Sequence, residues 1–98
     1  MKEIKGVIVP ILTPMREDGT INSEELVNQI ERLIDAGIHG IFVLGTNGEG
    51  YILDEDEKTE VIRVAVNTVN GRVPVYAGTG CVSTRDTVRM SRKAKELV

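Results

Sequence analysis

The chain has 98 residues and a formal net charge of −3, with 41% hydrophobic and 28% charged residues. These values are ordinary for one small globular domain. The negative charge gives no reason to expect a nucleic acid or an anionic membrane as a partner. An aromatic content of 3% without tryptophan argues against a base-stacking surface. The single cysteine, Cys81, cannot form an internal disulfide, which fits a reducing compartment.

The first apolar run is GVIVPILT, residues 6–13. It is too short to span a bilayer, and no cleavage-like stretch follows it, so we expect a cytoplasmic protein. A nearly continuous apolar run is typical of a parallel strand that is covered on both faces. Pro10 has no N–H group to donate, which places it at a sheet edge or a bulge. A polar loop follows this first predicted strand.

The next segment predicts a helix that begins near Asn22 and stops at Gly37. Asn22 and Glu25 have the spacing of a capping box, at the N-cap and N3 positions. The inward face of this helix is predicted to consist of Leu26, Ile30, Leu33 and Ile34, which recur at helical intervals. The apolar run at 40–45 is the second predicted strand.

Two further helices follow the same pattern. Asp54 and Glu57 form a second cap pair, and Gly71 ends that helix before a third strand at 73–80. Ser83 caps the last helix, with Asp86 at N3. The inward residues of the second helix are predicted to be Val61, Ile62, Ala65 and Val69. Those of the third are predicted to be Val88, Ser91, Ala94 and Leu97 or Val98.

The order strand–helix, repeated three times, predicts an α/β fold. Crossovers between parallel strands are right-handed, so strands in sequence order would place the helices on one face, as in a (β/α)₈ barrel. Such a barrel needs about 250 residues. We therefore interpret residues 1–98 as the first three units of one, truncated within or just after the third helix. Alternation alone does not fix strand order, so a doubly wound sheet stays open.

Glycines and small polar groups follow each predicted strand, at Thr13, at 45–49 and at 78–80. Active groups of barrels gather at these ends. The turn GTNGE at 45–49 is the most informative, because successive N–H groups beside glycines form an anion-binding concavity. It contains no lysine or arginine, so it suits one carboxylate better than a polyphosphate. The alternative is an ordinary glycine-rich connection between a strand and a helix.

The stretch GIFVLGTNGEGYILDEDE, residues 40–57, resembles the signature of the dihydrodipicolinate synthase / N-acetylneuraminate lyase family. The segments AGIHGI at 36–41 and RVPVYAGTG at 72–80 are similar to that family as well. The resemblance covers the whole chain. It implies a pyruvate-handling Schiff-base lyase or aldolase, with no metal or organic cofactor.

The resemblance also implies roles for individual residues. Thr46, Asn47 and Gly48 would hold the carboxylate of pyruvate or another 2-oxo acid, while Thr13, Gly78 and Thr79 would shape the pocket. Synthases and neuraminate lyases usually have threonine at the position of Asn47. An amide relays protons poorly, so this difference favours a sugar-acid or 4-hydroxy-2-oxoglutarate type of aldolase.

The Schiff-base lysine of this family would lie beyond Val98, on the sixth strand, and its catalytic tyrosine on the fifth. The lysines present are predicted to be solvated surface groups, including Lys58 and Lys93, so this chain alone is expected to be inactive. Glu49 is read as a structural group of the turn. His39 is placed at the opposite end of its strand.

Two alternatives belong to other classes of protein. A partial parallel sheet has edge strands with unpaired backbone groups and one uncovered face. These features predict a non-catalytic fragment that associates with itself as a dimer or higher oligomer. A flavodoxin-like nucleotide or phosphate binder could use GTGCVST at 78–84. The absence of lysine or arginine from that turn argues against it, although Arg85 is near.

Overall fold

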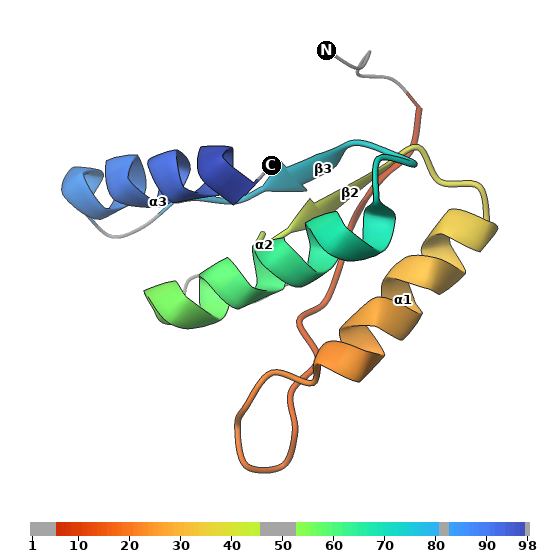
Figure 1. The fold of residues 1–98 in the computed structure, drawn as a ribbon, viewed down its shortest axis with the longest axis horizontal. Coiled ribbons are helices and arrows are strands. Elements are labelled where there is room, and N and C mark those ends of the chain that lie inside the picture. The colour runs from red at the N-terminus through yellow and green to blue at the C-terminus, as the bar shows by residue number, and fades with distance from the viewer. Residues whose placement is uncertain (1–5, 46–52, 81–82, 98) are drawn as a thin grey trace.

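The computed structural model of the chain describes residues 6–45, 53–80 and 83–97. Within them, strands and helices alternate (Figure 1). The elements are β1 (Ile8–Pro10), α1 (Ser23–Asp35), β2 (Gly40–Val43), α2 (Glu55–Val69), β3 (Val75–Ala77) and α3 (Thr84–Leu97). Both strand pairs are parallel and the sheet order is β1-β2-β3, which confirms the predicted repeat. Sequential order is that of a barrel segment, so the doubly wound alternative is not supported.

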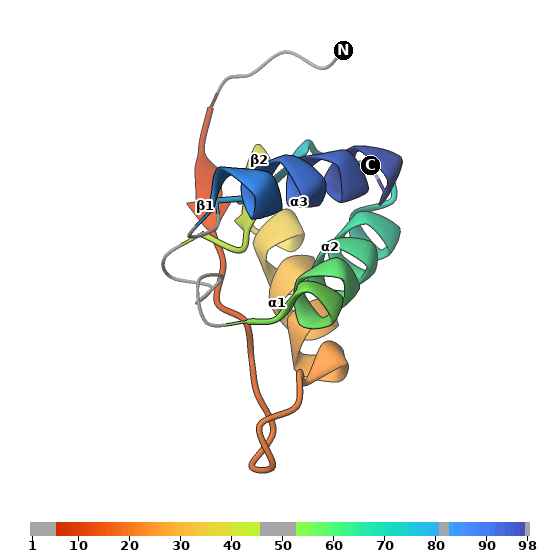
Figure 2. The ribbon, with the colours of Figure 1, turned by 90° about the vertical axis from the view of Figure 1, so that its left-hand side faces the viewer.

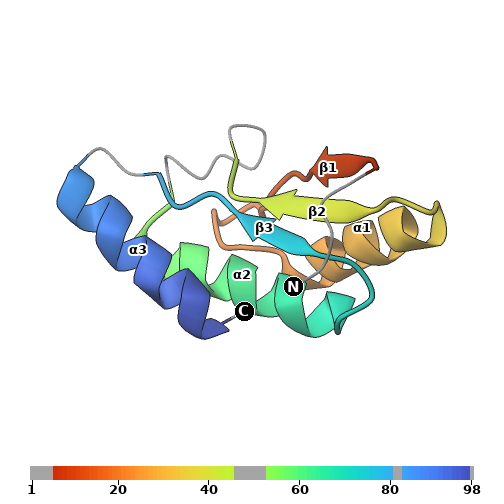
Figure 3. The ribbon, with the colours of Figure 1, turned by 90° about the horizontal axis from the view of Figure 1, so that it is seen from above.

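The three helices lie on one side of the sheet (Figure 3), and the view in Figure 2 shows the same two-layer arrangement. β1 is an edge strand, and Pro10 is its last residue, as predicted from its missing N–H. Pro10, Phe42 and Tyr76 stand in register across the three strands. The loop after β1 closes on itself through an antiparallel bridge between Met15 and Ile21 and projects away from the sheet in both Figure 1 and Figure 2.

The strands are shorter than the apolar runs that predicted them. The run at 6–13 contains a strand of three residues, and the run at 73–80 contains another. A strand needs a paired backbone as well as apolar residues. The expected cover on both faces of the first strand is also absent here, since Val7 is 57% exposed and Leu12 is 61% exposed. Beyond β1, the backbone of Leu12 bonds to a side chain of α1 instead of to a neighbouring strand.

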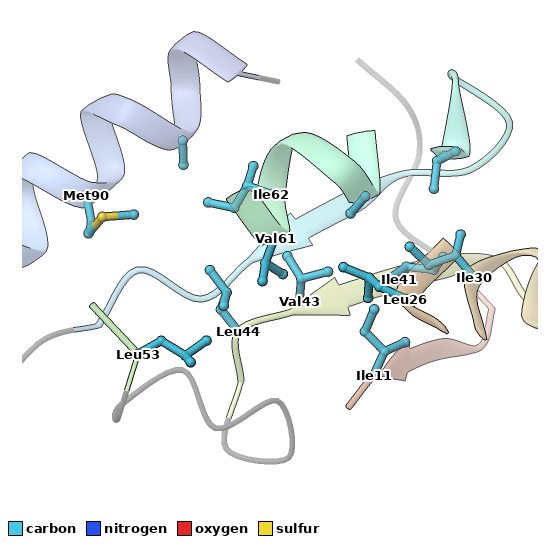
Figure 4. Packing of buried hydrophobic residues seen from close by; sticks show 13 residues of the cluster. Ile11, Leu26, Ile30, Ile41, Val43, Leu44, Leu53, Val61, Ile62 and Met90 are labelled. Carbon is cyan, nitrogen blue, oxygen red and sulfur yellow. The ribbon is translucent and has the colours of Figure 1, made fainter. Parts of the chain in front are cut away.

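The core lies between the sheet and the helices. Ile41 and Val43 of β2 are fully buried and point toward Leu26, Ile30, Val61 and Ile62 of the two central helices (Figure 4). The predicted inward residues of α2 are all buried. In α1, Leu26 and Ile30 are buried, and Leu33 and Ile34 pack against the cluster, so both helical faces are confirmed.

The helix starts also match the prediction. Asn22 accepts a hydrogen bond from the Glu25 amide at 3.1 Å. At α2 the capping box is complete, because the Glu57 amide donates to Asp54 at 2.8 Å and the Asp54 amide donates to Glu57 at 3.0 Å. At the end of α2, the C-cap residue Asn70 and the following Gly71 both have positive φ, +47° and +77°, so Gly71 lies just past the helix as predicted.

The predicted inward face of α3 is wrong in part. Ser83 does cap the helix, accepting from the Asp86 amide at 3.1 Å. However, Val88 is 45% exposed, whereas Met90 is only 2% exposed and packs into the core with Ala94. The helix is rotated from the predicted phase, so that Met90, Ala94 and Leu97 face inward at intervals of four and three residues.

The prediction of a solvated Lys58 is also wrong, because this residue is only 6% exposed in the first turn of α2. Lys93 is more exposed and binds Glu55 at 2.9 Å, and Arg89 binds the same carboxylate at 2.9 Å. The hydrogen bond from Lys93 holds the pKa of Glu55 below its ordinary value, and Glu55 raises the pKa of Lys93. This ion cluster joins the start of α2 to α3.

Candidate functional site

The three polar segments that the sequence singled out begin after the carboxyl ends of β1, β2 and β3. Because the strands are parallel and Pro10, Phe42 and Tyr76 are in register, the three chain segments leave the sheet at its carboxyl end. Thr13, Gly45 and Thr79 follow these register positions in the chain. The fold therefore brings together the strand ends that the sequence singled out, on the side where active groups of barrels gather.

Thr13 lies after β1 and is only 8% exposed. The residue before it is held by α1: the Gln29 side chain accepts from the Leu12 amide at 3.1 Å and donates to the Leu12 carbonyl at 3.0 Å. On the other side, the Asn22 amide donates to the Pro14 carbonyl at 2.8 Å. Helix α1 and its cap thus fix the backbone on both sides of Thr13.

The end of β2 has an unusual backbone. Leu44 is 5% exposed and has φ +62°, which is the left-handed region that bulky residues rarely adopt. Gly45 follows it, and a Cβ atom added there would lie 2.6 Å from Phe42 Cε1. The predicted carboxylate-binding residues Thr46, Asn47 and Gly48 lie outside the described residues, as do Glu49, Tyr51 and Cys81.

The end of β3 packs directly on the end of β2. The Gly78 amide donates to the Val43 carbonyl at 2.8 Å, and a Cβ atom on Gly78 would lie 2.5 Å from the Leu44 oxygen. The next residue is tied to a helix instead, since the hydroxyls of Thr79 and Ser91 are 2.8 Å apart. Gly78 therefore permits a close backbone approach, and Thr79 links the strand end to α3.

His39 lies at the opposite end of β2, as predicted. Its Nδ1 atom accepts from the Val7 amide at 2.9 Å, and its own amide donates to the Val7 carbonyl at 2.8 Å. The neutral ring with a proton on Nε2 is the form that can accept this bond. His39 thus joins the beginnings of β1 and β2 and is remote from the strand ends described above.

Two residues that support these strand ends, Gln29 and Leu44, were not predicted, and Ser91 was predicted only as part of the inward face of α3. Gln29 sits on a polar edge of an amphipathic helix, where a glutamine gives no signal of a tertiary bond. A leucine carries no sequence signal for positive φ, because that conformation is imposed by its surroundings. The Ser91 partner depends on the phase of α3, which the apolar pattern did not fix.

Within residues 6–45, 53–80 and 83–97, no group of three or more histidine, cysteine, aspartate or glutamate residues could hold a metal ion. Over the same residues, no helix is both long enough and apolar enough to cross a membrane. The groups at the described strand ends are backbone amides, hydroxyls and apolar side chains. The amides and hydroxyls form hydrogen bonds without carrying a charge.

Comparison with known proteins adds to this geometry. Residues 3–97 match the dihydrodipicolinate synthetase family. This chain belongs to that family. It is 47% identical over 93 residues to a 4-hydroxy-tetrahydrodipicolinate synthase of Pelobacter propionicus, covering 95% of this chain and 32% of the relative. It is 37% identical over 102 residues to a trans-O-hydroxybenzylidenepyruvate hydratase-aldolase of Sphingobium xenophagum, covering 97% and 31%.

A solved family structure has the same fold. The chloride-inhibited dihydrodipicolinate synthase of Acinetobacter baumannii, complexed with pyruvate, superposes with a TM-score of 0.93 at 39% identity. The match covers 97% of this chain and 33% of that one. The chain thus spans about a third of the length of the family members it matches. Its three β/α units correspond to part of a larger barrel, as the sequence predicted.

Proposed function

We propose that this chain supplies the carboxylate-binding part of a pyruvate-handling Schiff-base lyase or aldolase. Thr46, Asn47 and Gly48 would hold the carboxylate of a 2-oxo acid, and Thr13, Gly78 and Thr79 would form the surrounding wall. The observation that carries the proposal is the register that brings all three strand ends to one edge, in a chain of this family. The pyruvate complex of the Acinetobacter baumannii relative supports the choice of ligand.

The chemistry of these strand ends fits one carboxylate. Residues 45–50 and 78–80 contain no lysine or arginine, so backbone N–H groups and small side chains would have to bind the anion. Such groups can hold a single carboxylate while the neighbouring ketone stays accessible to an amine. The amine would then form an imine with loss of water, without a metal or an organic cofactor. We place this chemistry in the cytoplasm, in keeping with a single cysteine.

Residues 1–98 on their own are proposed to be inactive, as a partial barrel domain. The resemblance places the Schiff-base lysine after Val98. Lys93 is engaged with Glu55, and Lys58, although buried, belongs to a helix and not to a strand end. Borohydride reduction in the presence of pyruvate tests this directly: we expect no stable lysine adduct by mass spectrometry. An adduct on Lys58 or Lys93 would overturn the proposed inactivity.

Asn47 bears on the type of reaction. A threonine hydroxyl at this position can pass a proton, whereas an amide N–H is much less acidic and its oxygen only accepts. We therefore favour a sugar-acid or 4-hydroxy-2-oxoglutarate type of aldolase over a synthase for the protein to which these residues belong. Both a synthase and a hydratase-aldolase are among its relatives.

Ligand-observed NMR tests carboxylate binding by the chain. We expect pyruvate to bind and its methyl ester, which lacks the charge, not to bind. Replacing Thr46 by valine, which has the same shape without the hydroxyl, should weaken binding, and Thr46→Ser should keep it. Equal binding of the ester, or unchanged binding after Thr46→Val, would count against the proposed site.

A second candidate function is self-association without catalysis. The helices cover one face of the sheet (Figure 3), and no described strand pairs with the outer edge of β1 or β3. On each strand, residues that alternate with the core-facing ones lie on the other face, including Phe42 and Tyr76, which are half-buried. An apolar face and two open edges favour association with further copies.

Sedimentation velocity distinguishes this candidate from a simple monomer. We expect dimers or larger species at micromolar concentration. Tyr76→Lys should weaken association by placing a charge on the uncovered face, whereas Val88→Lys, on the exposed side of α3, should not. A wild-type chain that stays monomeric over the whole concentration range would exclude the candidate.

A further inference from the structure

The exposed large apolar side chains of the described residues lie at the two ends of the β/α repeat. They are Val7 and Leu12, on either side of β1, and Val88 on α3. The other large apolar side chains in residues 6–45, 53–80 and 83–97 are buried or half-buried, including those of the middle unit, β2 and α2. Exposed apolar surface at both ends, and not in the middle, favours contact of each end with a neighbouring unit.

The two outer helices carry opposite charge. Helix α2 lies between α1 and α3, so that each outer helix has one side without a helical neighbour in the described part of the chain (Figure 3). Helix α3 has five basic and two acidic residues, which gives a net charge of +3. Helix α1 has four acidic residues and one basic residue, which gives a net charge of −3. The outer helices are therefore complementary in charge.

Part of this charge is used within the chain. Arg89 and Lys93 of α3 bind Glu55 of α2, and Arg72, just after α2, binds Glu31 of α1. Ion pairs thus join each helix to the next one. Other charges of the outer helices are exposed and form no ion pair with the residues that the structure describes, namely Arg85, Arg92 and Lys95 on α3 and Glu24, Glu25 and Asp35 on α1.

The outer edge of β1 presents a reduced set of hydrogen-bonding groups. The Val7 carbonyl and the Ile11 amide bond to β2 or to the residue just before it. Backbone groups of successive residues in a strand point to opposite sides, so those of Ile8 and Pro10 point away from β2. Pro10 has no N–H group, so this edge presents the Ile8 amide and the carbonyls of both residues.

The outer edge of β3 has both kinds of group. The Pro74 carbonyl and the Gly78 amide bond to β2, so the backbone groups of Val75 and Ala77 point to the other side. In a parallel ladder with β1 of a second copy, the Ala77 amide would donate to the Ile8 carbonyl. The Ile8 amide would donate to the Val75 carbonyl. The two edges can therefore pair without the donor that the proline lacks.

We infer that copies of the chain associate head to tail, with β3 and α3 of one copy beside β1 and α1 of the next. The inference rests on the self-association proposed above and adds its surfaces and direction. The strands of both copies would run parallel, and the helices would stay on one face, as they do within the chain. Parallel helices place like ends side by side, so Arg85 would lie near Glu25 in the first turns. Lys95 would lie near Asp35 in the last turns.

A symmetric contact of α3 with α3 is disfavoured by charge. It would bring together two helices that each have a net charge of +3, and like charges across an interface cost free energy. A head-to-tail contact is heterologous, and it leaves an outer helix open at each end of the assembly. We therefore expect species larger than a dimer as the concentration rises.

Charge reversal tests the contact by sedimentation velocity. Arg85→Glu and Glu25→Arg should each weaken association by about 10-fold, because each places like charges across the contact. An equimolar mixture of the two variants should associate as the wild-type chain does, because the reversed charge of one variant then meets the reversed charge of the other. Arg63→Glu is the control, since it makes the same charge change at an exposed position on α2 and should leave association unchanged.

A second pair of variants covers the case in which Glu25→Arg does not fold. Asp35→Arg and Lys95→Glu lie at the opposite ends of the same helices, away from the α1 cap. They should show the same loss alone and the same recovery when mixed. Association of the wild-type chain should also weaken as the salt concentration is raised, because salt screens exposed charges.

The outcomes separate this inference from self-association in general. A wild-type chain that stays monomeric at all concentrations would overturn both. If the wild-type chain associates but either member of a folded charge-reversal pair leaves association unchanged, self-association stands and the head-to-tail contact is overturned. An equal loss from Arg63→Glu, or a mixture that associates no better than either variant alone, would overturn the contact as well.

Discussion

The side-chain amide of Gln29 makes both backbone hydrogen bonds of Leu12. It accepts from the Leu12 amide at 3.1 Å and donates to the Leu12 carbonyl at 3.0 Å. An amide side chain can do this because it carries a donor and an acceptor in one plane, as a neighbouring strand does. Helix α1 therefore takes over the support of the chain where the sheet ends, one residue before Thr13.

Replacing Gln29 by methionine removes both bonds at similar volume. Net contributions of neutral hydrogen bonds are small, so we expect a loss of about 1–2 kcal/mol in the free energy of unfolding. Urea denaturation measures it, and amide hydrogen exchange at Leu12 should become faster. Arg32→Met, at an exposed position on the same helix, is the control. Unchanged hydrogen exchange at the Leu12 amide would show that its hydrogen bond to Gln29 is not formed in solution.

The observed phase of α3 predicts that Met90 contributes more to stability than Val88, whereas the sequence pattern had placed Val88 in the core. Met90→Ala should cost about 2 kcal/mol or more, because Met90 is 2% exposed and its removal leaves a cavity. Val88→Ala should change stability by less than about 0.5 kcal/mol, because Val88 is 45% exposed. Denaturant unfolding of the two variants compares them, and a larger loss from Val88→Ala would mean that α3 has the other phase.

The capping box of α2 gives a prediction of its own. Asp54→Ala removes the acceptor of the Glu57 amide and should cost about 1 kcal/mol, whereas Asp54→Ser should keep most of the stability. Asp56→Ala is the control for the charge alone, which is worth only a few tenths of that amount near a helix start. Equal losses from Asp54→Ala and Asp56→Ala in urea denaturation would argue against the cap.

The ion cluster of Glu55, Lys93 and Arg89 predicts a pH dependence. The pKa of Glu55 is lowered from 4.5, chiefly by the hydrogen bond from Lys93, so its stabilising effect is present above that value and is lost as pH falls through the folded-state pKa. The pKa of Lys93 is raised from 10.5, chiefly by Glu55, so its contribution is present below that value and is lost as pH rises through the folded-state pKa.

Glu55→Gln should therefore lower the melting temperature slightly at neutral pH, and its curve should converge with that of the wild-type chain in acid. Melting curves from pH 2 to pH 8 measure the difference. Glu96→Gln, an exposed carboxylate on α3, should leave the curve unchanged. If the melting temperature of Glu55→Gln stayed below that of the wild-type chain at pH 2, the loss could not be due to the ion pairs of Glu55.

The order of the elements and their starts could be predicted because local chemistry decides them. Asn22 and Asp54 cap helices through bonds within one turn, and the apolar face of α1 is strongly periodic. The phase of α3 could not be predicted, because one apolar residue per turn leaves several faces possible. The burial of Lys58 and the left-handed Leu44 depend on contacts with distant segments, which spacing along the chain does not report.

The candidate site could likewise be predicted only in part. Thr13, Gly45, Gly78 and Thr79 were found because they follow apolar runs, and the register of the strands brings their segments to one edge. The close contact between Gly78 and the Leu44 carbonyl arises only when β2 and β3 pair. Glycine at 78 could signal many kinds of turn, and only the paired strands show which neighbour requires it.

The central claim is that the end of β2 binds the carboxylate of a 2-oxo acid, and mapping pyruvate by two-dimensional amide NMR tests it most directly. We predict that pyruvate shifts the amides of Gly45, Thr46 and Gly78 most strongly, and that its methyl ester leaves them unchanged. Absence of any shift at saturating pyruvate, or largest shifts at the α3 arginines Arg85, Arg89 and Arg92, would contradict the claim.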